Sequence, residues 1–190
     1  MKACSYRHRA SPSFKEYDIN TSPYDGAAEA WVADQEALQA LLEAPAYVAG
    51  ALADEPNFID MRRVEFHPTE DRVILEGTRK QGGVKGLYRI KRRPEFTVEQ
   101  FRRYWLEVHA EYGLRLPGLR RYMQCLTTDV NYRDGEPAWD GVAQIWFDDV
   151  AAVRAMIDSP ICVESYEDIL KFVGAFDVLF VDEIPMLTCS

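Results

Sequence analysis

The sequence predicts an α+β fold assembled from two related halves, and two internal similarities indicate this. The segment from Tyr24, YDGAAEAWVADQEALQALLEAPAYV, matches the segment from Trp139, WDGVAQIWFDDVAAVRAMIDSPICV, at many positions. A shorter motif, Tyr-Arg followed by a basic residue and then Pro-x-Phe, occurs in residues 6–14 and again in residues 88–96. Apolar residues occupy equivalent helical positions in both copies, so internal duplication is the interpretation.

The second copy contains four predicted strands. VKGLYRIKR (84–92) and LRRYMQCLTTDV (119–130) are rich in apolar and β-prone residues, as are GVAQIWF (141–147) and FDVLFVDEI (176–184). Runs of this kind are typical of strands that are largely buried.

Two helices are predicted between these strands. Thr97 and Gln100 fit a capping box that begins the first helix, and Gly113 is expected to end it. Asp149 is the expected N-cap of the second helix, which carries an apolar stripe at helical spacing. The resulting order, β-α-β-β-α-β, predicts a ferredoxin-like unit.

The first copy is shorter. GAAEAWV (26–32) predicts a strand, a leucine-rich helix follows, and MRRVEFH (61–67) predicts the last strand. Its opening strand aligns with residues 6–14, so a helix and a strand are missing before Tyr24; the alternative is that residues 3–10 match the second strand. The first alignment is favoured because the loss then removes only an edge of a sheet ordered 4-1-3-2. The expected domains are a shortened half (1–80) and a complete half (84–190).

The composition excludes several classes of partner. The net charge of −9 and the pI of about 4.9 argue against a nucleic-acid groove or an anionic membrane surface. No apolar run reaches the roughly 20 residues of a membrane span, and the N-terminal residues lack the apolar core of a signal peptide, so a cytoplasmic location is expected. The four cysteines are scattered, which favours reduced thiols over a zinc site.

The second copy resembles the EthD family of dimeric α/β-barrel proteins over residues 84–187. The resemblance rests on KRRPEFT, TVEQFRRYWLEVHAEY, LPGLRRYMQ and WDGVAQIWFDD taken together. The chain departs from the family where His-x-Pro is common, because it has His109, Ala110 and Glu111 there. The resemblance implies two ferredoxin-like units that close into a barrel, usually from two chains, and activities of the dehydratase, decarboxylase or related lyase type on aromatic, polyketide-like compounds. A homodimer is expected because a missing edge strand leaves an open seam.

His109 is the first candidate catalytic residue. It follows Phe101 and Trp105 at helical spacing, so all three side chains are expected on the face turned toward the sheet. A neutral imidazole there can transfer protons in enolisation, dehydration or decarboxylation. The structural alternative is a core histidine bonded to a carbonyl group.

Five further residues complete the predicted site, each with a structural alternative. Tyr122 and Tyr88 could hold or protonate a substrate oxygen, although a strand tyrosine often serves packing. Trp146 could stack on a flat ring, although it matches Trp31 and a pair of core tryptophans is the favoured interpretation. Asp140 could orient a histidine, although its counterpart Asp25 favours a role in a turn. His8 replaces an apolar residue of the other copy and could act together with His109.

The leading hypothesis is a cofactor-independent lyase or isomerase that acts on a small aromatic molecule. No nucleotide-binding fingerprint, phosphate loop or clustered metal-ligand spacing occurs in the sequence. One alternative is a non-catalytic binding or assembly protein on the same scaffold. Another is a haem-dependent enzyme with His109 as an axial ligand.

Overall fold

The computed structural model describes residues 4–10, 21–78, 80, 82–133 and 135–187, with the side chains of 4–10 and 185–187 left aside. The chain divides into two compact units. The larger unit comprises residues 8–27 and 68–183, and the smaller comprises residues 1–7, 28–67 and 184–190. The two halves expected from the internal repeat, residues 1–80 and 84–190, have other bounds than these units and stay a prediction.

Five strands of the large unit form an antiparallel sheet. β4 (Val84–Arg92) lies between β6 (Gly141–Phe147) and β7 (Val173–Leu187), β5 (Leu119–Thr127) pairs with β6, and β3 (Thr69–Leu75) pairs with β5. The order β7-β4-β6-β5 is the 4-1-3-2 order of a ferredoxin-like unit. β1 (Cys4–Ala10) and β2 (Gly26–Trp31) follow beyond β7. The α+β class is confirmed.

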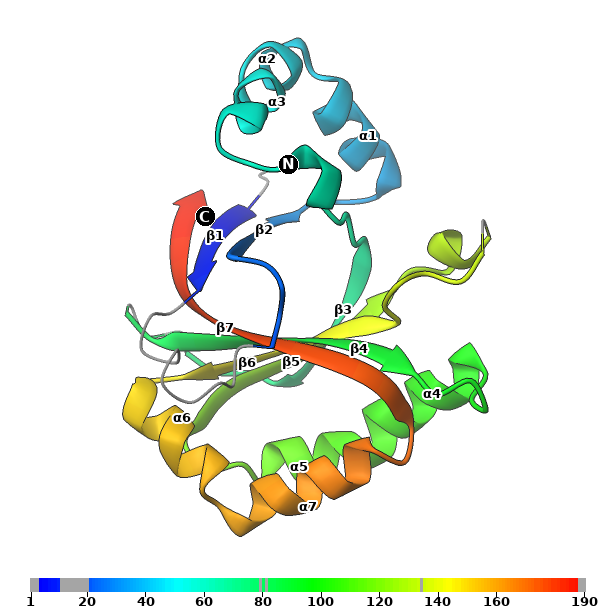
Figure 1. Cartoon of the computed structure of the whole chain (residues 1–190), viewed down its shortest axis with the longest axis vertical. Coiled ribbons are helices and arrows are strands. Elements are labelled where there is room, and N and C mark those ends of the chain that lie inside the picture. Colours follow the sequence, from blue (N-terminus) through cyan, green and yellow to red (C-terminus); the bar gives the residue numbers. More distant parts are fainter. Residues whose placement is uncertain (1–3, 11–20, 79, 81, 134, 188–190) are drawn as a thin grey trace. The chain divides into compact units, whose positions relative to one another are not determined.

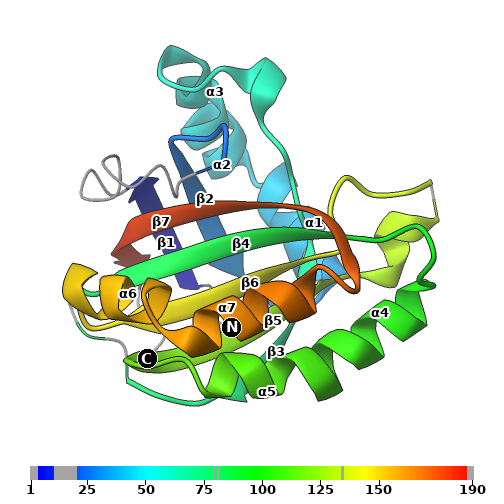
Figure 2. The ribbon, with the colours of Figure 1, turned by 60° about the horizontal axis from the view of Figure 1, so that its bottom comes forward.

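Helices cover one face of the five-stranded sheet (Figures 1 and 2). α4 (Val98–Tyr104), η4 (Trp105–His109) and α5 (Ala110–Leu114) form one continuous helix, and α6 (Val150–Ile157) and α7 (Pro160–Ile169) follow β6. A short 3-10 turn, η5 (Asp129–Tyr132), follows β5. Among the described residues, no helix has the length and apolarity needed to cross a membrane.

The core lies between these helices and the sheet. Alternate residues of each strand point toward the helices, as strand geometry requires, and they pack against Phe101, Trp105, Val153 and Phe172, each 0% exposed. Phe172, which follows α7, lies against the ring of Phe101 at 5.8 Å between centroids. This contact packs the segment that follows α7 against α4.

The small unit consists mainly of short helices: α1 (Gln35–Glu43), α2 (Pro45–Ala49), α3 (Ala51–Asp54), η2 (Glu55–Asn57) and η3 (Met61–Arg63). The predicted correspondence with α6 holds locally. Asp34 and Asp149 cap α1 and α6 with φ of −163° and −166°, and each side chain accepts a hydrogen bond from the N–H three residues later, at 2.8 and 2.9 Å. The two segments therefore begin their helices in the same way.

The burial of the two segments differs. Phe58 is 61% exposed, whereas Phe172, its counterpart in the repeat, is 0% exposed. Phe66 is 65% exposed, whereas its counterpart Phe180 is 2% exposed. None of the described residues from 28 to 67 is classed as buried. The segment predicted to be the first copy thus contains core-type residues that do not form a core among the described residues of its own unit.

The strand predicted at residues 61–67 is wrong. The carboxylate of Asp60 accepts the backbone N–H of Arg62 at 3.3 Å, and the carbonyl of Asp60 accepts the N–H of Arg63 at 2.9 Å, so the chain turns through η3 instead. The strand forms after Pro68, as β3, where the residues pair with β5 from Thr69 onward. The sequence did not lead us to predict a strand at residues 69–75.

Candidate active site

A small apolar cavity lies between the helices and the sheet of the large unit. Its volume is about 120 Å³, and residues of β4, β5, β6 and β7 line one side while η4, α5, α6 and α7 line the other. Four of the residues predicted for the site line this cavity: Tyr88, Trp105, His109 and Tyr122. Cys162 of α7 also lines it.

The helix that carries Trp105 and His109 contains a π turn. The helix begins at the predicted capping box, in which Thr97 and Gln100 exchange hydrogen bonds of 2.9 and 3.1 Å. At η4 the N–H of Ala110 donates to the carbonyl of Trp105, five residues earlier, instead of four. Such turns are frequent at functional sites because they re-aim side chains within a helix.

Gly141 leaves space for the Trp105 ring. A Cβ atom at residue 141 would lie 2.4 Å from the indole ring of Trp105, closer than any side chain permits. The start of β6 therefore has to be glycine for the indole to pack against the sheet, where it is 0% exposed.

His109 is bonded to a buried carboxylate. Its Nδ1 lies 2.9 Å from Oδ2 of Asp168 in α7, and the two side chains are 9% and 1% exposed. The ring of Phe172 packs on the imidazole at 5.1 Å between centroids. Nε2, the other ring nitrogen, has no hydrogen-bond partner among the described residues, and His109 lines the cavity.

The environment keeps His109 neutral and Asp168 ionised. Burial lowers the pKa of His109, and the opposing effect of Asp168 is smaller. The pKa of Asp168 is also lowered, because hydrogen bonds from His109, Tyr104 and Lys171 outweigh the cost of burying its charge. A neutral imidazole beside a carboxylate carries its proton on Nδ1, as the hydrogen bond requires. Nε2 then has a free lone pair and can act as a base.

Asp168 is held by two further side chains. The hydroxyl of Tyr104 donates to its Oδ1 at 2.8 Å, and Nζ of Lys171 lies 3.0 Å from the same oxygen. Lys171 is 60% exposed, so this ion pair reaches the surface of the unit. The carboxylate is thereby fixed in the position from which it orients His109.

Tyr122 lies in the cavity because residue 113 is glycine. A Cβ at Gly113 would lie 2.6 Å from Cε1 of Tyr122. Gly113 does not end the helix as expected; the helix continues to Leu114, and the glycine admits the tyrosine ring instead. Burial raises the pKa of Tyr122 to about 12, so its hydroxyl stays protonated at neutral pH.

Tyr88 comes from the central strand β4, where it is opposite Ala143 on one side and Val178 on the other. Burial, and secondarily the electrostatic effect of Cys162, raise its pKa well above the ordinary range. Its hydroxyl therefore also remains a hydrogen-bond donor. Its ring meets Phe180 edge to face, at 5.9 Å between centroids.

The structure does not bring the other predicted residues into the cavity. Phe101 is a core residue that packs against Trp105 at 5.4 Å between ring centroids. Trp146 belongs to a separate cluster with Met123 and Cys125, formed by the strand residues that alternate with those facing the helices. The backbone of His8 belongs to β1, and its side chain lies outside the described residues.

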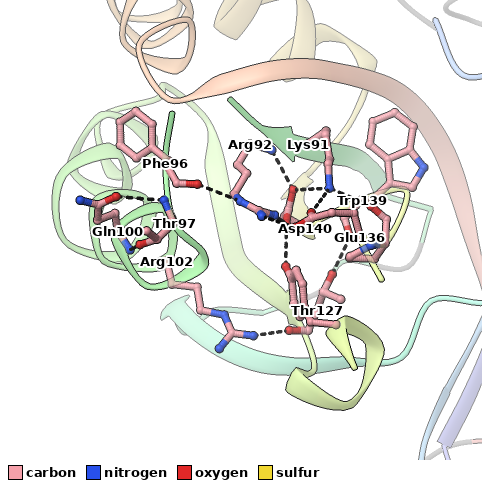
Figure 3. Close-up of polar contacts among 12 residues, drawn as sticks. Lys91, Arg92, Phe96, Thr97, Gln100, Arg102, Thr127, Glu136, Trp139 and Asp140 are labelled. Atoms are coloured by element: carbon pink, nitrogen blue, oxygen red, sulfur yellow. Dashed lines mark hydrogen bonds and ion pairs between the residues drawn. The ribbon is translucent and has the colours of Figure 1, made fainter. Parts of the chain in front are cut away.

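Asp140 lies at the centre of a polar cluster (Figure 3). Its side chain is 0% exposed and contacts Nζ of Lys91 at 3.2 Å, the backbone N–H of Arg92 at 2.9 Å and the hydroxyl of Tyr132 at 2.6 Å. It also forms an ion pair with the guanidinium of Arg92. These contacts fasten the end of β4 to the start of β6, which is a structural role.

Two residues of the site were missed by sequence reasoning. Asp168 is an acidic residue in a helix whose neighbours Ile169 and Cys162 face the core, and an acid on such a face needs a buried partner. The sequence thus indicates that Asp168 needs a buried partner, but it does not show that this partner is His109. Gln124, 0% exposed, lies two residues after Tyr122 on the same strand face.

No group of three or more metal-ligating side chains occurs among the described residues.

Comparison with protein families gives one match. The model of the EthD domain matches two segments of the chain, residues 7–62 and 93–175, which together make up most of its length. A search of curated proteins found no significant match.

Solved structures with related folds include three that differ in how much of this chain they cover. An EthD family protein from Bacillus halodurans C-125 is 22% identical, with a TM-score of 0.43, and covers 52% of this chain and 95% of its own. Two proteins, each described as a "putative monooxygenase", cover 96% of this chain. The one from Lactobacillus acidophilus NCFM is 11% identical with a TM-score of 0.52 over 94% of its own chain. The other, from Fusobacterium nucleatum, is 8% identical with a TM-score of 0.57 over 91% of its own chain. At these identities the likeness concerns the fold.

Proposed function

Because the chain belongs to the EthD domain family, we propose that it is an enzyme that moves a proton on a small aromatic or polyketide-like molecule. The reaction is of the lyase or isomerase type, as in dehydration or decarboxylation, and His109 is the general acid and base. One observation carries this proposal. The buried imidazole of His109 lines an apolar cavity, burial lowers its pKa, its Nδ1 is bonded to Asp168 at 2.9 Å, and its Nε2 has no hydrogen-bond partner among the described residues.

The chemistry follows from this arrangement. Nε2 takes a proton from a carbon or hydroxyl of the substrate, and the electron pair of the broken bond stays on the substrate. The ionised Asp168 stabilises the imidazolium that forms, without itself accepting the proton. The imidazolium then returns the proton to another atom of the substrate or to a departing hydroxyl group. The proton balance closes within one turnover, so this residue pair meets the needs of the proposed reaction.

The cavity limits the size of the substrate. Its volume of about 120 Å³ is close to the roughly 150 Å³ of an apolar cavity that binds benzene. A single ring therefore matches it better than a fused system. A haem would need a far larger space than the cavity that His109 lines.

The small volume also favours the second candidate function, a non-catalytic binding protein. Pockets that bind drug-sized ligands usually have about 300 to 1,000 Å³. A cavity below that range could retain one small ligand without turning it over.

An assay of product formation separates these functions. The native protein is incubated with one-ring phenols, cyclic diketones and aromatic keto acids, and each mixture is analysed by mass spectrometry while oxygen consumption is recorded. Product without oxygen uptake, lost in His109→Asn and kept in His67→Asn, supports the lyase or isomerase. His67→Asn is the matched control because His67 is not among the residues that line the cavity.

Three results would count against the proposal. Equal turnover by His109→Asn and native protein would remove His109 from the mechanism. Binding without product would favour the carrier. Product that depends on oxygen uptake would point to a monooxygenase, the activity suggested by the names of two structural neighbours.

We also propose that the chain forms a homodimer. Eight large apolar residues of the small unit are exposed: Leu41, Leu42, Val48, Leu52, Phe58, Met61, Val64 and Phe66. Large exposed apolar patches mark sites of protein–protein contact, so these residues support a subunit interface. No nucleic-acid or membrane partner is proposed, since the net charge is −9.

A further inference from the structure

Resting on the proposed function, we infer that the cavity contains a site for an oxyanion, formed by the hydroxyl of Tyr122 and the indole N–H of Trp105. The reacting form of the substrate is then an enolate or a phenolate. Gln124 is the positioning residue that turns the Tyr122 hydroxyl toward the ligand.

The orientation of the Gln124 amide is fixed by its partners. Nε2 donates to the carbonyl oxygen of Trp105 at 3.0 Å and to the hydroxyl oxygen of Tyr122 at 2.7 Å. The opposite orientation would place the amide oxygen against a carbonyl oxygen, which cannot donate. Both hydrogens of the amide nitrogen are therefore used, and one of them points at Tyr122.

This fixes the role of the Tyr122 hydroxyl. Its oxygen accepts from Gln124, so its own hydrogen has to be donated to a different atom. No described residue accepts that hydrogen, and Tyr122 is 3% exposed and lines the cavity. A buried hydroxyl without an acceptor is costly, and an oxygen of a bound ligand is the acceptor that the cavity allows.

The second donor is the indole of Trp105. Its Nε1 is buried and has no hydrogen-bond partner among the described residues, although Trp105 is 0% exposed and lines the same cavity. Burial raises the pKa of Tyr122, and the Gln124 amide and the nearby Trp105 indole N–H both oppose that rise, although the indole N–H does not reach the geometry of a complete hydrogen bond to the Tyr122 oxygen. The two groups therefore lie near each other, and both residues line the cavity.

The donors and the base act on the same electron pair. When Nε2 of His109 removes a proton, a C–H or O–H bond of the substrate breaks, an N–H bond forms, and negative charge collects on the substrate oxygen. Fixed donors aimed at the developing charge lower the barrier most in a site that excludes water. The cavity therefore contains an acceptor for the proton and donors for the charge, which is the arrangement that enolisation requires.

The test compares an anion with a neutral molecule of the same shape. The probes are para-nitrophenol, at a pH where it is ionised, and para-nitroaniline, which is neutral; binding is measured by equilibrium dialysis. The native protein is expected to bind the phenolate at least about tenfold more tightly than the aniline, since one charge-assisted hydrogen bond contributes that much or more. Visible absorbance of bound para-nitrophenol should show the ionised form at a lower pH than in buffer.

Three variants locate this preference. Tyr122→Phe and Trp105→Phe each remove one donor, and each should reduce the preference about tenfold while the aniline still binds. Gln124→Met removes the amide that orients the hydroxyl, and it should reduce the preference without changing the affinity for the aniline. Thermal melting checks that each variant is folded, and Tyr122→Phe keeps the test decisive if Trp105→Phe does not fold.

The outcomes separate this inference from the proposed function. If Tyr122→Phe and Gln124→Met keep the full phenolate preference, or the native protein has none, the oxyanion site is wrong even where His109→Asn abolishes turnover. If the phenolate preference depends on Tyr122 but His109→Asn turns over substrate normally, the oxyanion site is supported and His109 is not the general base. If neither probe binds, the cavity does not accept a substituted ring and the inference is overturned.

Discussion

Asp168 determines which nitrogen of His109 is basic. Its carboxylate accepts the Nδ1 proton, and Tyr104 and Lys171 keep it ionised and in place. Helical periodicity predicted that His109, Trp105 and Phe101 share a face, and Tyr88 and Tyr122 were predicted to hold or protonate a substrate oxygen. Asp168 could not be identified in this way, because its partner comes from a helix 59 residues away in the chain.

Replacing Asp168 with Asn should lower kcat about a hundredfold while KM changes little, because the amide no longer fixes the tautomer or stabilises the imidazolium. The pKa of His109 should fall further, since the carboxylate currently opposes the effect of burial. The measurement is the pH dependence of kcat. A variant with native kcat and an unshifted profile would assign Asp168 to folding alone.

The stability of the protein should decrease as the pH falls below 6.5. Burial holds the pKa of His109 below its ordinary value of 6.5, so the unfolded chain binds this proton more readily than the folded chain. The stabilisation is complete above the ordinary pKa and is lost as the pH drops through the lower, folded-state value. Asp168, whose pKa is also lowered, adds a further loss at more acidic pH.

Urea unfolding at a series of pH values measures this effect. The unfolding free energy of His109→Gln should depend less on pH between neutral and mildly acidic conditions, whereas His67→Gln should follow the native curve. A native slope in His109→Gln would show that His109 does not have a lowered pKa.

At the scale of elements, the helix from residue 98 to residue 114 shows what local sequence can and cannot predict. Its capping box and apolar face follow from residues three and four apart, and both are confirmed. The helical Gly113 makes room for the ring of Tyr122 from β5, so no local pattern revealed its role, and none revealed the π turn at η4. For the same reason β3, whose partner β5 is distant in sequence, was missed and residues 61–67 were wrongly predicted.

Gly113→Ala should destabilise the protein by about 1–3 kcal/mol, because the new methyl group collides with the buried Tyr122 ring. In an exposed helix the same change would stabilise by up to about 1 kcal/mol. The double variant with Tyr122→Ala separates the two effects, since there the alanine should no longer destabilise. Equal effects in both backgrounds, measured by urea unfolding, would show that the contact is unimportant.

At the scale of the whole molecule, the EthD model matches two segments, residues 7–62 and 93–175. The duplication, with a shortened first copy (1–80) and a complete second copy (84–190), stays a prediction. The matched N-caps of α1 and α6 support it. The repeat predicted the complete unit well, because that unit contains all the strands and helices its apolar residues need. It predicted the first copy less well, because a copy without those elements cannot bury the same residues.

The proposed dimer is tested by sedimentation. The native protein should have twice the chain mass of 21.8 kDa. Phe58→Asp and Phe66→Asp, at positions 61% and 65% exposed, should weaken association without unfolding the large unit. Val163→Asp is the matched control, since Val163 is 57% exposed on α7 of the large unit. A monomeric native protein, or equal weakening by the control, would contradict the assignment.

The most direct test of the central claim is ¹⁵N NMR of the His109 imidazole with and without phenol. We predict a neutral ring at neutral pH with its proton on Nδ1, and an Nε2 signal that shifts when phenol binds while Nδ1 stays bonded to Asp168. Asp168→Asn should disturb the Nδ1 signal first. A proton on Nε2, a charged ring at neutral pH, or no response to phenol would contradict the account of His109 as the base of a ligand cavity.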